Sequence, residues 1–179
     1  METKSKSSKK SAKSTDESKL REFFIDELKD IYWAEQALYK ALPKMAQAAT
    51  SKKLAKAFEK HTMETEGQIA TLEKAFELLG EKAEAKKCKA MEGLLKEADS
   101  VIEDTDEGTH TRDVGLIVSS QKAEHYEIAS YGALTVIAEN IGEPKVAKLL
   151  KKILDEEKKT DISLSIVAEN KVNASAAKE

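Results

Sequence analysis

Apolar residues recur at alternating spacings of four and three from Leu20 onward, which is the pattern of one face of an α-helix. The positions on this face are Phe24, Leu28, Ile31, Glu35, Leu38 and Leu42. The segment therefore predicts a long amphipathic helix with one buried side. We expect Pro43 to kink or end this helix, because proline lacks the N–H that the preceding turn needs.

Three later segments repeat the same periodicity. Residues 54–79 follow Ser51, a residue type that caps helix N-termini, and they stop at Gly80, a residue type that ends helices. The other two periodic segments cover residues 114–138 and 146–167. Each segment is apolar on one face only, so the predicted helices need one shared core.

A long connection, residues 81–110, separates the second and third periodic segments. It contains its own stretch of helical spacing around Met91, and then an acidic stretch from Glu103 to Gly108. A connection of this length lets the third long helix start at the opposite end of the bundle from the point where the second one stops. The sequence therefore predicts an all-α fold, a ferritin-like four-helix bundle with one long crossover that contains an extra helix.

The two ends of the chain lack this pattern. Residues 1–18 are rich in Lys and Ser and have no large apolar side chain after Met1, so we predict a disordered tail. We predict the bundle over residues 19–170 and a flexible C-terminal tail over residues 171–179. The lysines of the first segment permit weak contact with nucleic acid, but without interleaved aromatic residues we expect no dedicated nucleic-acid interface.

The composition favours a helical protein that does not enter a membrane. Only seven glycines and two prolines interrupt the 179 residues, and the net charge of −3 creates no strong field toward nucleic acid or membrane. No apolar run is long enough to span a bilayer, and we find no secretory leader. Cys88 is the one cysteine, which suits a reducing compartment, so we expect a cytoplasmic protein.

Each apolar face is interrupted near its middle by side chains that can bind a cation. The interrupting residues are Glu35 in the first segment, His61 and Glu64 in the second, Glu124 and Gln121 in the third, and Glu157 and Asp161 in the fourth. Glu127 follows Glu124 by three positions and is a further candidate. An unpaired carboxylate in a core costs several kcal/mol, so helices that each contribute one need a shared counter-charge.

Two sources of positive charge are open. Lys60, Lys122 or Lys158 could reach in from flanking positions and form a buried salt-bridge network. Metal ions are the favoured source, because carboxylates with imidazole suit iron, manganese or zinc, and two ions neutralise four or five carboxylates. The known di-metal bundle takes a Glu from each of two helices and a Glu-x-x-His pair from each of the others. This chain fits that template in part, since His61-x-x-Glu64 has the reversed order.

The other histidines and the aromatic residues are weaker candidates. His125 lies about 100° around the helix from Glu124 and should face another surface, and His110 falls in a predicted loop. We predict that the tyrosines and the tryptophan mainly pack, with a hydrogen bond from Tyr131 to a metal ligand as the less favoured interpretation.

Five strings within residues 20–167 resemble the YciF/YciE family of bacterial ferritin-like stress proteins. They are FIDELKDIYWAE at 24–35, LPKMA at 42–46, HTMETEGQ at 61–68, EHYEIASY at 124–131 and LDEEKKTD at 154–161. The resemblance implies a ferritin-like bundle, commonly a homodimer, with a di-metal site of the di-iron type and a role in stress tolerance. No well-defined reaction is attached to that family.

Carried over to the matching positions, the resemblance supports the metal ligands that interrupt the helix faces. They are Glu35, His61, Glu64, Glu124, Glu127, Glu157 and Asp161. We expect two transition-metal ions, iron or manganese before zinc. One hypothesis is oxygen or peroxide handling at these ions. The alternative is a metal-stabilised structural or partner-binding stress protein without redox turnover, so enzymatic activity stays open.

Overall fold

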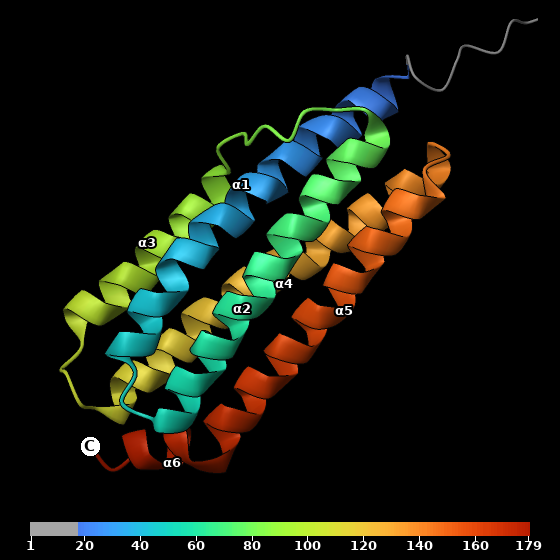
Figure 1. Ribbon diagram of the computed structural model, residues 1–179. Helices are drawn as coiled ribbons and strands as arrows, with labels where there is room; N and C mark the ends of the chain where they lie inside the picture. Colours follow the sequence, from blue (N-terminus) through green and yellow to red (C-terminus); the bar gives the residue numbers. More distant parts are fainter. Residues whose placement is uncertain (1–17) are drawn as a thin grey trace, which may run out of the picture.

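Four long helices form a bundle in the computed structural model, which describes residues 18–179 (Figure 1). They are α1 (Lys19–Ala48), α2 (Lys52–Leu79), α4 (His110–Asn140) and α5 (Pro144–Val167). The predicted fold class is therefore confirmed. The predicted disordered tail lies outside the described residues except for Ser18, whose hydroxyl accepts a hydrogen bond from Arg21 N and caps α1.

Neighbouring long helices run antiparallel. Helix α1 contacts α2 and α4, and α5 contacts the same two helices, so α1 and α5 occupy opposite corners. The start of α1 meets the end of α2, where Arg21 donates a hydrogen bond of 2.8 Å to Leu79 O. The end of α1 meets the start of α4, where Asp113 accepts hydrogen bonds from the backbone N–H groups of Thr50 and Ser51.

The crossover carries the chain from the end of α2 back to the other end of the bundle. Residues 81–88 run without helix beside α1, where Lys86 N donates to Lys29 O, and α3 (Lys89–Asp104) then packs against α1 and α4 (Figure 1). Lys44 of α1 pairs with Asp99 of α3 at 2.7 Å. This is the predicted crossover with its extra helix.

Two of the predicted helix boundaries are as expected, and of the two effects predicted for Pro43, the end of the helix is not found. Ser51 caps α2, and Gly80 ends it with a φ of 69°, a left-handed backbone that glycine adopts without strain. Helix α1, in contrast, runs through Pro43 to Ala48 instead of ending there. Leu42 and Met45 are buried on either side of the proline, and this packing keeps the segment helical despite the missing N–H.

The core consists of two apolar clusters, one toward each end of the bundle. The first gathers side chains such as Phe24, Leu72 and Leu150, and the second gathers side chains such as Phe58 and Leu116. Between these clusters the inward positions of the four long helices are polar. The sequence predicted such interruptions, and the structure brings them to one level.

The C-terminal segment differs from the flexible tail predicted for residues 171–179. A π-helical turn, η2 (Ala168–Val172), and the short helix α6 (Asn173–Ala176) continue α5, and Val172 is only 2% exposed. The Glu179 carboxylate accepts hydrogen bonds from the backbone N–H groups of His110 and Thr111. These N–H groups have no partner within their own helix, so they bind the acidic end of the chain. His110 is accordingly the first residue of α4 and not part of a loop.

No helix in the part of the chain that the structure describes combines the length and the apolar character needed to cross a bilayer.

Deleting residues 171–179 should destabilise the bundle. The deletion exposes the site of Val172, whose burial stabilises by about 1.5 kcal/mol, and frees the N–H groups at the start of α4. Urea unfolding followed by circular dichroism measures the loss. An unchanged midpoint would show that this segment contributes nothing to the fold.

Candidate metal centre

Four glutamates and one histidine lie in the polar layer between the two apolar clusters. Glu35 comes from α1, His61 from α2, Glu124 and Glu127 from α4, and Glu157 from α5. The four glutamates are 0% exposed and His61 is 1% exposed. All four long helices therefore contribute to one buried group of ionisable side chains.

Four of these residues lie within metal-binding distance of one another. His61, Glu124, Glu127 and Glu157 each offer one ligand atom, and these atoms all lie within 4.8 Å of one another. The Nε2 atom of His61 is 3.1 Å from Oε1 of Glu124. Glu124 and Glu127 are three positions apart on α4, so the helix presents both on the same face. We call these four residues the cluster.

Neighbouring polar side chains hold some of the carboxylates in place. The Tyr131 hydroxyl donates a hydrogen bond to Oε1 of Glu35, and the Gln68 amide donates one to Oε1 of Glu157. The Ser120 hydroxyl lies 3.4 Å from Oε1 of Glu124. The bond from Tyr131 is the less favoured interpretation of the sequence, and no role is predicted for Gln68. Its position seven residues after His61 was the available signal.

Many buried polar atoms of this layer have no hydrogen-bond partner among the described residues. They are Oε2 of Glu35, Glu124 and Glu157, both carboxylate oxygens of Glu127, Nδ1 of His61, and Oε1 of Gln68. Each unpaired buried group costs about 1–3 kcal/mol, and more when it is charged. Such a set of oxygen and nitrogen atoms matches what a transition-metal ion binds.

The alternative of a buried salt-bridge network finds no support here. Lys60 pairs with Glu64, and Lys122 pairs with Glu97, both at the surface. Within residues 18–179, none of the ion pairs joins a lysine or an arginine to the four buried glutamates. The positive charge that this layer needs must therefore come from protons or from bound cations.

Burial shifts the pKa values of several groups in the layer. It raises the pKa of Glu35 to about 7, against the lowering effects of the Tyr131 hydrogen bond and of His61. It also raises the pKa values of Glu127 and Glu157 well above the usual range, and the neighbouring carboxylates add to this effect. Burial alone would lower the pKa of His61, but the carboxylate of Glu124 outweighs it and the net pKa is raised.

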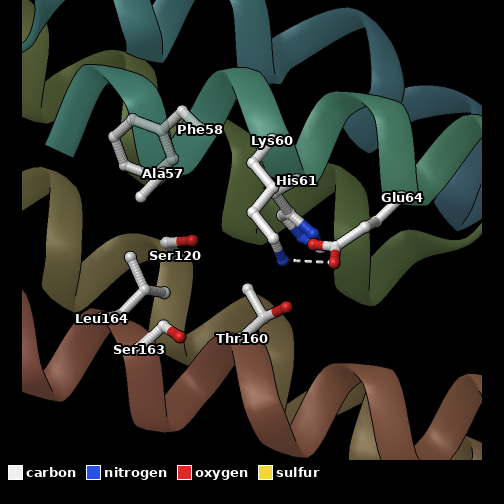
Figure 2. A pocket seen from close by; sticks show the side chains of 9 residues that line it. All are labelled: Ala57, Phe58, Lys60, His61, Glu64, Ser120, Thr160, Ser163 and Leu164. Atoms are coloured by element: carbon white, nitrogen blue, oxygen red, sulfur yellow. Dashed lines mark hydrogen bonds and ion pairs between the residues drawn. The ribbon is translucent and has the colours of Figure 1, made fainter. Parts of the chain in front are cut away.

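Two predicted ligands lie at the edge of this layer and not in the cluster. The Glu64 side chain is 31% exposed and pairs with Lys60 (Figure 2). Asp161 accepts a hydrogen bond of 2.9 Å from Gln121 and lies 3.4 Å from His125, which points outward as predicted. The inward face of α2 passes through Thr65 and Gln68, which turns Glu64 aside.

The comparison with known proteins agrees with this fold. A family model described as a domain of unknown function (DUF892) matches residues 19–177. The chain belongs to this family. It is 49% identical over 158 residues to Protein YciF of Escherichia coli (strain K12), a match that covers 88% of this chain and 95% of YciF. The predicted membership of the YciF-type stress protein family is thus confirmed.

Solved structures of related proteins share the helical bundle. The crystal structure of the E. coli stress protein YciF matches with a TM-score of 0.82 and 48% identity, covering 86% of this chain and 97% of that one. YcfI of Rhodopseudomonas palustris, described as a proposed structural protein, has a TM-score of 0.80 and 36% identity, with 86% and 98% covered. A protein of Xanthomonas campestris pv. campestris has a TM-score of 0.69 and 28% identity, with 90% and 98% covered.

The metal-free protein should lose stability as the pH rises. The folded protein raises the pKa values of four groups above those in the unfolded chain, namely Glu35, Glu127, Glu157 and His61. The stability that their bound protons provide is therefore complete below pH 4.5, and it is lost as the pH rises through the folded pKa values. For Glu35 alone the loss by pH 8 is on the order of 3 kcal/mol. Urea unfolding in chelator at pH 5 and pH 8 measures it. Equal stability at both values would show that these groups ionise as they do in water.

Replacing Glu127 by leucine should stabilise the metal-free protein at pH 8. The change removes a carboxyl group with no hydrogen-bond partner, and the gain is on the order of 1–3 kcal/mol. The matched control is Glu64→Leu on α2, which breaks only a surface ion pair and should cost less than about 1 kcal/mol. A large loss of stability in Glu127→Leu would show that a buried cation of the protein pairs with Glu127.

Proposed function

We propose that this protein binds two transition-metal ions in the polar layer and uses them in the response to stress. The observation that carries the proposal is the set of buried ligand atoms without partners in the cluster and on Glu35. Four ionised glutamates carry four negative charges, which two divalent ions balance. The name of the YciF relative as a stress protein supports the physiological setting.

Iron or manganese fits the ligand set better than zinc does. The layer offers one imidazole and carboxylate oxygens from four glutamates, with no thiolate among them. Oxygen-rich sites with an imidazole suit iron and manganese, whereas zinc prefers four ligands with more nitrogen or sulfur. His61 would bind through a neutral ring nitrogen, and Glu127, with both oxygens free, would offer the most adaptable carboxylate.

The chain's own residues would set the conditions for reaction at such a site. Bound iron or manganese would supply the electrons for reduction of oxygen or peroxide. Tyr131 holds Glu35 and Gln68 holds Glu157, so these two carboxylates keep their orientation while the others adjust. The apolar clusters on both sides keep bulk water out of the layer. These features support handling of oxygen or peroxide.

The second candidate function is structural. Ions that balance the buried glutamates would also stabilise the bundle without any turnover, and the description of YcfI as a proposed structural protein favours this alternative. Partner contacts would then come from the outer faces, where Val118 and Val136 of α4 and Ile162 and Ile166 of α5 are about half exposed. A homodimer through such a face, in the cytoplasm, is part of the proposal.

Metal analysis of the reconstituted protein tests the proposal directly. Wild-type protein loaded with iron or manganese should retain about two ions per chain after gel filtration. Glu127→Gln should lose at least one ion, because it removes a ligand with two free oxygens. Glu97→Gln, which changes an exposed glutamate of α3, is the matched control and should retain both. No stoichiometric metal in the wild type would contradict the proposal.

Loading the same protein with either metal then separates the two functions. Peroxide consumption that depends on iron or manganese and is lost in Glu127→Gln supports the redox function. Full metal content with a raised melting temperature and no consumption of oxygen or peroxide supports the structural one.

A further inference from the structure

A small pocket between α2 and α5 leads toward the cluster (Figure 2). Its volume is about 40 Å³, which is room for roughly three water molecules. Residues of α2 and α5 form its walls, and Ser120 of α4 lies at its back. A pocket of this size admits a small ion or molecule and excludes larger ligands.

The pocket borders the metal centre. His61 of the cluster is part of its lining, and Ser120 reaches from the pocket to the Glu124 carboxylate. Two other surface pockets, lined by Phe23 with Tyr126 and by Gly132 with Leu154, include no residue of the cluster. Of these three pockets, the α2–α5 pocket is the one lined by a residue of the cluster.

The chemistry of the wall suits a cation that has lost part of its water. A fully hydrated divalent ion carries about six waters, which is more than the pocket holds. Ser120, Thr160 and Ser163 present hydroxyl groups to the pocket, and their oxygens can replace water molecules around the ion. An ion moving inward would then meet His61 and the glutamates behind it.

A positively charged and a negatively charged side chain lie together at the mouth of the α2–α5 pocket. Lys60 and Glu64 lie one turn apart on α2, both line the pocket, and they form an ion pair on its α2 side (Figure 2). The Lys60 ammonium repels an approaching cation and occupies the Glu64 carboxylate that would attract it. Exposed pairs of this kind break easily, so Glu64 can exchange Lys60 for a metal ion.

We infer that the α2–α5 pocket is the route by which divalent cations reach the cluster, and that the Lys60–Glu64 ion pair at its mouth limits the rate of uptake. This inference rests on the proposed metal binding. It gives Glu64 a role at the mouth of the pocket. This role explains why Glu64, which the family resemblance predicted as a metal ligand, lies outside the cluster.

Uptake kinetics of the full-length, chelator-treated protein test the route. Co²⁺ alone is added at low salt, its binding is followed by visible absorbance, and the final metal content is measured after several hours. Ser163→Phe places a ring over the pocket from an exposed position and should slow uptake about tenfold or more without changing the final content. Ala133→Phe places the same ring over the α1–α4 pocket and should load as the wild type does.

A second pair of variants tests the ion pair and does not depend on filling the pocket. Lys60→Glu frees the mouth of its positive charge and should speed Co²⁺ uptake roughly three- to tenfold at low salt, with a smaller effect at 0.5 M salt. Lys74→Glu makes the same charge change on the same helix, about 21 Å farther along, and should change the rate less than about twofold.

The outcomes separate the route from the site. If the wild type loads but Ser163→Phe and Lys60→Glu load at its rate, the route is overturned and the metal site stands. If the wild type takes up no Co²⁺, both the site and the route are overturned. Slower uptake in Ser163→Phe together with faster uptake in Lys60→Glu, at equal final content, supports the route.

Discussion

Four glutamates and a histidine share a buried layer in which no lysine or arginine of residues 18–179 pairs with the glutamates, and the structure must offset the cost of removing these charges from water. The apolar clusters above and below this layer supply the burial that offsets the cost. At low pH, protons neutralise the carboxylates, and at higher pH only bound cations can do so. The stability of the fold therefore depends on the protonation of this layer and, under the proposed function, on bound metal.

The layer combines fixed and adaptable groups. Tyr131 and Gln68 each hold one carboxylate in place, whereas neither oxygen of Glu127 has a hydrogen-bond partner in the described part of the chain. A fixed carboxylate keeps the position of an ion, and an unrestrained one can change how it binds when the charge of the ion changes. This division suits redox chemistry, but it also allows an ion with a purely structural role.

The residues that surround the buried layer differ from one side to another. The apolar clusters cover the two ends of the layer, and Phe58 and Leu164 of the second cluster line the α2–α5 pocket together with polar residues. Glu64 stands at the mouth of that pocket, and Asp161 lies at the edge with Gln121 and His125. The side of the layer between α2 and α5 is therefore bordered by a pocket that contains polar residues.

The sequence by itself determined the helices, the crossover and the five buried ionisable residues, because helical periodicity states which positions share an inward face. It could not separate Glu64 and Asp161 from the cluster, because each lies within one helical turn of a residue that is buried in the layer. Only the packing of α2 against α5 decides which of these side chains points inward. It also missed the docked C-terminal segment. The contact between Glu179 and the start of α4 joins residues that are 69 positions apart, and no local pattern encodes such a contact.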